Sequence, residues 1–240
     1  MIVTIHQPEH LPWLGFFDKA RQADILVILD HVQYRKNYFQ NRNRIRAHSG
    51  AVWLTVPVLT KGNSSQAINE VQINTQGSPR WGEKYWVSLA QSYQRTPFWK
   101  DHEPFFKDLF SKHGWTYLAD LNESIIRYLL DALSIYVKVV KSSTMDVGGA
   151  SGDLLLNICR QLNADIYLSG VSGKSYLNLD VFTGADIEVR FQEFHHPIYK
   201  QAYAPFIPCM SVIDLLFNYG PASLEVIKGI GVETMERIFE

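Results

Sequence analysis

Short apolar runs and amphipathic segments alternate along the chain. Residues 2–5 and 25–29 are apolar and rich in β-branched side chains, which predicts two buried strands. Between them, apolar residues at 14, 16, 17, 20 and 23 have helical spacing. Strand, helix and strand in this order form a βαβ unit, in which the two strands run parallel.

The same patterns continue through the rest of the chain. They predict an α/β fold with a Rossmann-like, largely parallel sheet, helices on both faces and a helical, aromatic-rich insertion over about 78–134, all within one domain spanning 1–240. Further strands are predicted at 51–57, 67–73, 135–140, 165–169 and 187–191. Further helices are predicted at 81–93, 104–112, 120–133 and 151–162, and from a Ser211 cap to Gly220.

Composition narrows the class of protein. The 240 residues are 46% hydrophobic, enough for a sizeable core, and the net charge of −1 gives no general attraction to nucleic acid or membranes. No apolar run reaches the roughly 18 residues of a membrane span, and the first residues do not resemble a signal peptide. We therefore expect a cytoplasmic protein without a membrane partner. The two cysteines stand in apolar surroundings and form no C-x-x-C pattern, which fits a reducing compartment better than a disulfide framework.

The first predicted strand ends in a loop that holds the first candidate site. His6, Gln7 and His10 follow the strand directly, and Pro8 and Pro12 prevent it from continuing. Ligands of α/β folds collect at the carboxyl ends of parallel strands, and histidine exchanges protons near neutral pH. His6 and Gln7 are therefore catalytic candidates and His10 a binding candidate, although each histidine alone also fits a structural role. The prolines exclude the helical zinc spacing, so no metal site is predicted.

A cationic segment follows the second predicted strand. Residues 30–46 carry five arginines and lysines and no acid after Asp30, interleaved with asparagines and aromatic rings. Such a segment can bind phosphate or carboxylate groups, with Asn41, Arg42 and Arg44 as candidates, or it can be a solvated loop. Lys61 beside Gly62 is a weaker candidate for a phosphate contact.

Two further segments carry candidate chemistry. Ser169, Gly170, Lys174 and Tyr176 lie at or after the end of another predicted strand, where G-x-x-G-K-S lacks the four-residue spacing of a P-loop but still fits a looser anion nest. Asp214 lies in the first turn of the last helix, where a carboxylate either stabilises the helix or takes part in catalysis.

Several blocks together are similar to one known family. They are the opening H-Q-P-x-x-L-P-W-L-G-F-F, V-Q-Y at 32–34 with N-R-N-x-I at 41–45, W-L-T-V-P at 53–57, Y-L-S-G at 167–170, Y-x-Q at 199–201, and F-x-P-x-x-S-x-x-D-L-L-F-N-x-G at 206–220. The chain thereby resembles the WbqC-like family, which implies a role in bacterial O-antigen or other surface-polysaccharide synthesis. These blocks add Trp13, Gln33, Tyr199, Gln201 and Ser211 to the binding candidates. The family has an aromatic residue where this chain has His10.

The opening unit also looks like the adenylyl-transferring superfamily that includes pantothenate synthetase. In that superfamily, histidines in the first loop stabilise phosphate charge during attack on ATP. The His-x-Gly-His form is absent here. This similarity makes ATP a candidate cofactor.

Two functions from different classes follow. The first is a transferase or ligase that attaches a small acyl or aminoacyl group to the amine of a nucleotide-linked amino sugar, with ATP and a free acid, a thioester or an aminoacyl-tRNA as donor. The alternative is a non-catalytic module that binds a nucleotide sugar or RNA. Outside residues 35–46 the basic residues are interspersed with acids, which does not favour a general RNA-binding surface.

Overall fold

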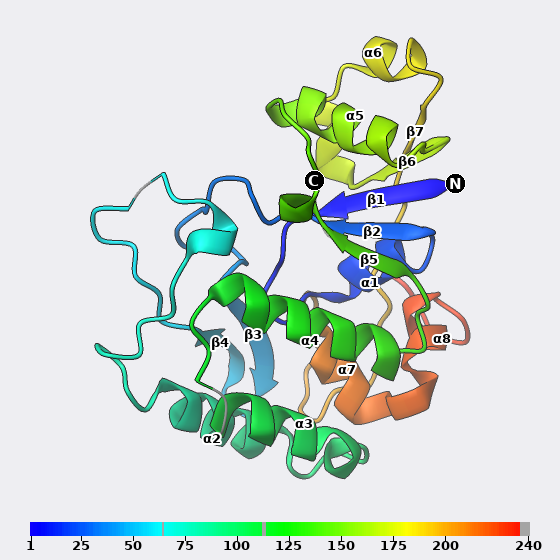
Figure 1. Ribbon diagram of the computed structural model, residues 1–240. Coiled ribbons are helices and arrows are strands. Elements are labelled where there is room, and N and C mark those ends of the chain that lie inside the picture. Colours follow the sequence, from blue (N-terminus) through cyan, green and yellow to red (C-terminus); the bar gives the residue numbers. More distant parts are fainter. Residues whose placement is uncertain (64, 112–113, 236–240) are drawn as a thin grey trace.

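Five parallel strands form the central sheet in this computed structural model, which describes residues 1–63, 65–111 and 114–235. The strand order is β5-β2-β1-β6-β7, and every pair of neighbours is parallel (Figure 1). The α/β prediction, with a Rossmann-like sheet, is therefore confirmed. The strands are β1 (Ile2–His6), β2 (Ile25–Ile28), β5 (Lys138–Lys141), β6 (Ile166–Ser169) and β7 (Glu188–Phe191).

Helices cover both faces of this sheet because alternate residues of its inner strands are apolar on both sides. In β2, Ile25 and Val27 pack with one cluster of buried residues and Leu26 and Ile28 with the other. The first cluster includes α5 (Ser151–Gln161) and Phe182 of α6 (Leu179–Thr183). The second cluster includes residues of α1 (Leu14–Ala20), α4 (Leu118–Ala132), α7 (Val212–Tyr219) and α8 (Ser223–Ile227).

A separate antiparallel hairpin lies beside the sheet and differs from the sequence prediction. It joins β3 (Arg42–Ala47) to β4 (Gly50–Thr55), whereas the sequence placed the first of these segments in a loop. The inward residues of β3 include Asn43 as well as Ile45, both almost fully buried. A polar residue thus occupies an inward position between two arginines, and no apolar alternation marks the strand.

The strand predicted at 67–73 is wrong. Its residues form a short 3-10 turn, η1 (Ile68–Glu70), and isolated bridges at Ile73 and Gln72. Ile68, Val71 and Ile73 are buried, so their spacing reflects core packing rather than pairing along a ladder. Tertiary burial has overridden the local β pattern here.

The aromatic-rich helical region is present, with α2 (Trp81–Tyr93), α3 (Trp99–Ser111) and α4. Its rings pack on one another: Tyr85 stacks on Phe110 at 4.2 Å and Trp86 on Trp99 at 5.3 Å between centroids. α3 begins five residues before the predicted start, and Pro104 lies inside it. The predicted last residue of this helix, Lys112, lies outside the described residues.

The helix predicted from Ser211 to Gly220 is α7, and it begins and ends where the sequence indicates. The Ser211 hydroxyl accepts the backbone N–H of Ile213 at 3.4 Å, and Gly220 adopts a left-handed φ of 50° at the other end. A backbone bridge joins Ser211 to Trp13, so the first and last of the sequence blocks shared with the family lie side by side. In the part of the chain that the structure describes, no helix has the length and apolar character of a membrane span.

Candidate functional site

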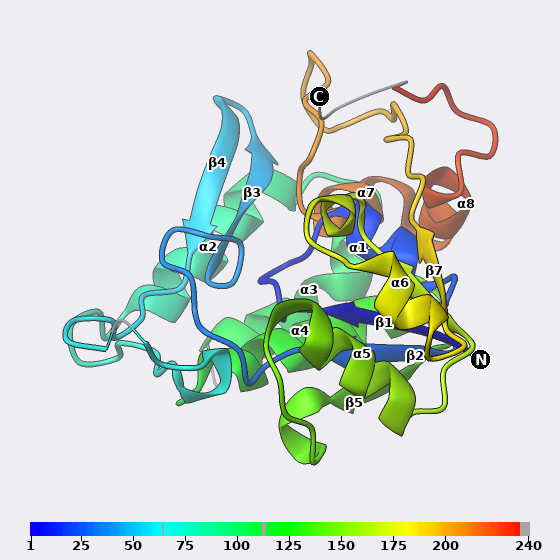
Figure 2. The same cartoon turned by 90° about the horizontal axis from the view of Figure 1, so that it is seen from above.

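A cavity of about 650 Å³ opens at the carboxyl ends of β1 and β6. The strand order reverses between these neighbours, since β1 leads on to β2 and β5 while β6 leads to β7 (Figures 1 and 2). Such a reversal leaves a crevice beyond the strand ends, which is the usual ligand site of parallel α/β folds. The volume lies within the range of small-molecule sites.

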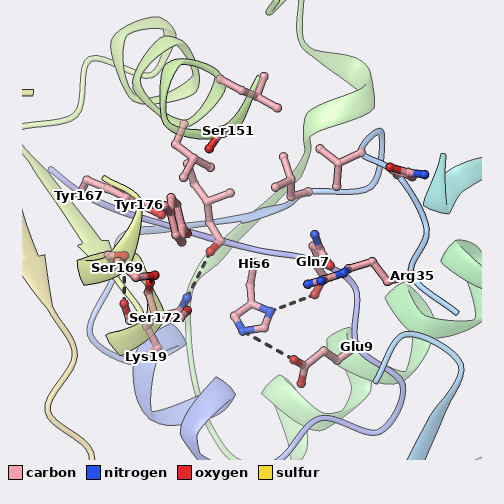
Figure 3. A pocket seen from close by; sticks show the side chains of 18 of the residues that line it. His6, Gln7, Glu9, Lys19, Arg35, Ser151, Tyr167, Ser169, Ser172 and Tyr176 are labelled. Carbon is pink, nitrogen blue, oxygen red and sulfur yellow. Dashed lines mark hydrogen bonds and ion pairs between the residues drawn. The ribbon is translucent and has the colours of Figure 1, made fainter. Parts of the chain in front are cut away.

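His6 ends β1 and faces the middle of this cavity (Figure 3). Its Nδ1 lies 3.0 Å from the backbone oxygen of Gln7, a contact that places the ring proton on Nδ1 and leaves a lone pair on Nε2. Burial, and to a smaller extent the charge of Lys19, lower the pKa of His6 to about 3. The imidazole is therefore neutral at physiological pH and able to accept a hydrogen bond through Nε2.

A buried acid and a buried base complete the centre of the cavity. Glu9 and Lys19 are 7% and 4% exposed, and both line the cavity with His6. Burial raises the pKa of Glu9 to about 7, against the opposing effect of Lys19. Burial lowers the pKa of Lys19 to about 8, and its Nζ donates to the Ile5 carbonyl at 3.2 Å. One Glu9 oxygen, Oε2, has no hydrogen-bond partner within the described chain. The pKa values of Glu9 and Lys19 thus lie near neutrality, and Glu9 has unused hydrogen-bonding capacity.

The sequence prediction missed both Glu9 and Lys19. Glu9 stands between the two prolines of the opening loop, so a carboxylate three residues after His6 was an available signal. The sequence pattern did not single out Lys19, because charged residues of an amphipathic helix usually face solvent. In α1 every residue is buried, including Asp18 and Lys19. Only the packing of α1 under the sheet reveals that this lysine points inward.

Polar groups surround the three central side chains. The segment after β6 supplies Ser169 and Gly170 and continues as a 3-10 turn, η3 (Val171–Ser175). Ser151 opens α5 at the upper wall, where the free N–H groups of a helix start favour anions (Figure 3). Arg35 contributes a guanidinium at the opposite rim. The cavity therefore combines a central acid–base cluster with anion-binding groups at its edge.

Six of the predicted site residues line this cavity. Gln7 is held there by Gln40, whose Nε2 donates to its Oε1 at 2.7 Å. The six are His6, Gln7, Gln33, Ser169, Gly170 and Tyr176. The remaining predicted residues do not line it: His10, Trp13, Asn41, Arg42, Arg44, Lys61, Lys174, Tyr199, Gln201, Ser211 and Asp214.

His10 is fully buried behind the loop. Its Nδ1 lies 2.8 Å from Asn122 Oδ1 and its Nε2 lies 2.7 Å from the Tyr85 hydroxyl. Asn122 also donates to the carbonyls of Pro8 and Gln40. The ring thus fastens the opening loop to α4 and α2, a structural connection rather than a cavity contact.

Asp214, Tyr199 and Gln201 form a second buried cluster. The Asp214 carboxylate accepts three hydrogen bonds. The hydroxyls of Tyr93 and Tyr199 donate to it at 3.0 Å and 2.9 Å, and Gln201 Nε2 donates at 2.9 Å. Burial raises the pKa of Asp214 to about 6, and these hydrogen bonds oppose the rise. The carboxylate is fully satisfied by the protein, and it joins α7 to α2 and to the loop after β7.

The other predicted residues lie in backbone or surface contacts. Asn41 donates to the Val56 carbonyl, Ser211 caps α7, and Trp13 packs edge-on against Phe194. Lys61 lies in an exposed turn and Lys174 over the ring of Phe191. Arg42 and Arg44 lie on the outer face of the hairpin, near the indole of Trp53.

No three His, Cys, Asp or Glu side chains come together as a metal-binding group anywhere in residues 1–63, 65–111 and 114–235. The cluster that the cavity does offer, a histidine, a glutamate and a lysine, suits proton transfer and charge stabilisation.

Comparison with known proteins agrees with the resemblance in the sequence. A family model described as the WbqC-like protein family matches residues 7–226. The chain is 30% identical over 227 residues to the uncharacterized protein Rv1507c of Mycobacterium tuberculosis, covering 94% of this chain and 97% of that protein. No solved structure gives a significant match. The matched segment contains the cavity residues from Gln7 to Tyr176 and extends through the Asp214 cluster, so the chain belongs to the WbqC-like protein family.

Proposed function

We propose that the protein is an amide-forming transferase or ligase of surface-glycan synthesis. It joins a small activated acyl or aminoacyl group to the amine of a nucleotide-linked amino sugar. The observation that carries the proposal is the buried Glu9, whose pKa is about 7. Glu9 lines a cavity of substrate size together with the neutral His6 and with Lys19.

The chemistry of amide formation requires such a base. A sugar ammonium must lose a proton before its nitrogen can attack an acyl carbon, and a carboxylate with a pKa near 7 accepts this proton at neutral pH. His6 Nε2 accepts a second hydrogen bond from the amine and orients it. The Lys19 ammonium stabilises the negative charge that develops on the acyl oxygen.

The rim of the cavity supports a phosphorylated substrate. The residues that line the cavity include Arg35, Ser151 at the start of α5, and the hydroxyl-bearing Ser169, Ser172 and Ser175. Their position beyond the strand reversal is where nucleotides bind in parallel α/β sheets. This arrangement favours a nucleotide-linked acceptor and is equally suited to ATP when the donor is a free acid.

The test is a product assay. The protein is incubated with nucleotide-linked amino sugars and, in turn, ATP with carboxylic or amino acids, acyl thioesters and aminoacyl-tRNA, and the amide is sought by mass spectrometry. We expect an amide product with one donor class. Release of AMP and pyrophosphate identifies the adenylating route.

The control is the Glu9→Gln protein, which keeps the shape of the cavity and loses its base. Nucleotide-sugar binding without any amide product from any donor would overturn the enzymatic proposal and favour the binding module.

A further inference from the structure

A strip of aromatic rings and arginines runs from the cavity onto the hairpin. Neighbouring rings lie 5.4 Å apart between Tyr38 and Phe39 and 5.9 Å apart between Phe39 and Trp53. Guanidinium carbons lie over the two end rings, at 5.3 Å for Arg35 on Tyr38 and 4.5 Å for Arg42 on Trp53. The cationic strip consists of Arg35, Tyr38, Phe39, Arg42, Arg44 and Trp53.

One end of the cationic strip belongs to the cavity wall. Arg35 and Tyr38 line the cavity, whereas Arg42, Arg44 and Trp53 do not. The register of the hairpin places Arg44 opposite Trp53 on its outer face, because Asn43, Ile45 and Leu54 point inward. Tyr38 and Trp53 are 41% and 44% exposed. A ligand can therefore reach from the hairpin into the cavity along one continuous surface.

The segment of the chain that holds the cationic strip carries basic residues and no acidic ones. Residues 31–69 contain six arginines and lysines and no aspartate or glutamate, while the rest of the chain holds 17 basic and 24 acidic residues. Arg35, Arg42 and Arg44 have no carboxylate partner in the described part of the chain. The near-zero net charge of the chain thus conceals one cationic segment, and three of its arginines, Arg35, Arg42 and Arg44, belong to the cationic strip.

We propose that the cationic strip binds the single-stranded 3′ end of an RNA that carries the transferred group as an ester on its terminal ribose. Spaced rings that stack bases and cations that contact phosphates are the usual features of single-strand binding. Three rings and three guanidinium groups in succession exceed what one nucleotide occupies. The cavity end of the cationic strip receives the acylated ribose. The assignment of this RNA as the donor rests on the proposed amide-forming function.

The reaction that follows is balanced. The sugar ammonium gives one proton to Glu9, and its nitrogen forms a bond to the ester carbon. The bond between that carbon and the ribose oxygen breaks, and the oxygen takes the second proton from nitrogen. The products are an amide, a free ribose hydroxyl and a protonated Glu9 that returns its proton to solvent. No oxidant, reductant or nucleoside triphosphate is consumed.

Binding is tested with a labelled single-stranded RNA of about six nucleotides, a length that one small binding surface covers. Fluorescence anisotropy is recorded over a series of salt concentrations. Three phosphate contacts predict that the logarithm of the binding constant falls with the logarithm of salt concentration with a slope of about −2. Arg42→Ala with Arg44→Ala should flatten this slope by more than half. Trp53→Ala should weaken binding by roughly tenfold through lost stacking.

Two matched variants control for surface charge and exposed rings. Arg80→Ala removes an exposed arginine that pairs with Glu83, and Tyr136→Ala removes a ring that is 89% exposed, both far from the cationic strip in sequence. Neither should change RNA binding. Circular dichroism confirms that each variant is folded. Equal loss in the control and strip variants would overturn the proposal.

Two further measurements separate this proposal from the proposed function. Glu9→Gln should lower the rate of amide formation by roughly 10²–10⁴-fold while leaving RNA affinity unchanged. Absence of RNA binding at low salt, with amide formed from ATP or a thioester, would overturn the RNA proposal and leave the amide-forming function intact. If the strip variants weaken binding of UDP and no RNA binds, the strip serves the nucleotide of the sugar and the RNA proposal is wrong.

Discussion

The Nε2 atom of His6 lies 3.9 Å from the Oε1 atom of Glu9. This separation exceeds a direct hydrogen bond, and a polar atom placed between them can lie about 2.8 Å from both. His6 comes from the end of β1 and Glu9 from the proline-bounded loop that follows it, so one short segment of the chain sets both positions (Figure 3). The pair is therefore organised to receive a substrate atom, such as the amine nitrogen, before any substrate binds.

Replacing Glu9 by Gln should lower the rate of amide formation by roughly 10²–10⁴-fold, the usual contribution of a general base. The amide keeps the shape of the side chain and cannot accept the proton. Steady-state kinetics should show the loss in kcat, with little change in KM for the nucleotide sugar. Glu83→Gln, on the surface of α2 and outside the cavity, is the matched control. A Glu9→Gln protein with full turnover would exclude Glu9 as the base.

The dependence of kcat/KM on pH should be bell-shaped. Glu9 is an active base only when it is ionised, so the rate should rise as pH increases through about 7. Lys19 stabilises the oxyanion only when it is protonated, so the rate should fall as pH increases through about 8. The Lys19→Met protein should lose the alkaline limb together with much of its rate. A rate that stays constant between pH 6 and pH 9 would contradict both roles.

Replacing His6 by Asn should lower turnover by about 10²-fold or more while the melting temperature changes little, because the side chain faces the cavity rather than the core. His10→Phe should behave in the opposite way. It leaves Asn122 Oδ1 and the Tyr85 hydroxyl without their buried partner, which costs about 1–3 kcal/mol of stability. Urea unfolding and kinetics on the same preparations distinguish the two histidines. Equal turnover losses in both variants would contradict the assignment.

Tyr199→Phe should destabilise the protein more at pH 7.5 than at pH 5. The pKa of buried Asp214 is raised to about 6, so its carboxyl is ionised at the higher pH, where the bond from Tyr199 is charge-assisted and its loss costs about 1.5–3 kcal/mol.

At pH 5 the carboxyl is protonated, so the cost should fall to about 0.5–1.5 kcal/mol. Linkage predicts the same sign. Because the pKa of Asp214 is raised in the folded protein, the free energy of unfolding falls as pH rises through about 6. Removing the Tyr199 hydroxyl, which donates to the carboxylate, makes this fall larger. Urea unfolding at both pH values, with Tyr136→Phe as an exposed control, measures the difference. An equal loss at both values would show that Asp214 does not titrate in this range.

The sequence by itself determined the central layer of this protein. β1, α1 and β2 were predictable because their apolar residues repeat with the period of each element, and parallel pairing follows from a helical connection. His6 was predictable as a site residue because it follows the first strand directly. The end of α7 was predictable from the Ser211 cap and from Gly220.

Only the tertiary structure decided which polar residues meet. The sequence did not reveal β3 because its inward Asn43 is polar. Arg42 and Arg44 came to share a surface with Trp53 only when the hairpin paired Arg44 with Trp53. Asp214 and His10 have the residue types of a site, yet buried donors from distant segments satisfy them. Glu9 and Lys19 acquire pKa values near neutrality from burial, and burial is a property of the packed molecule that no local pattern of residues encodes.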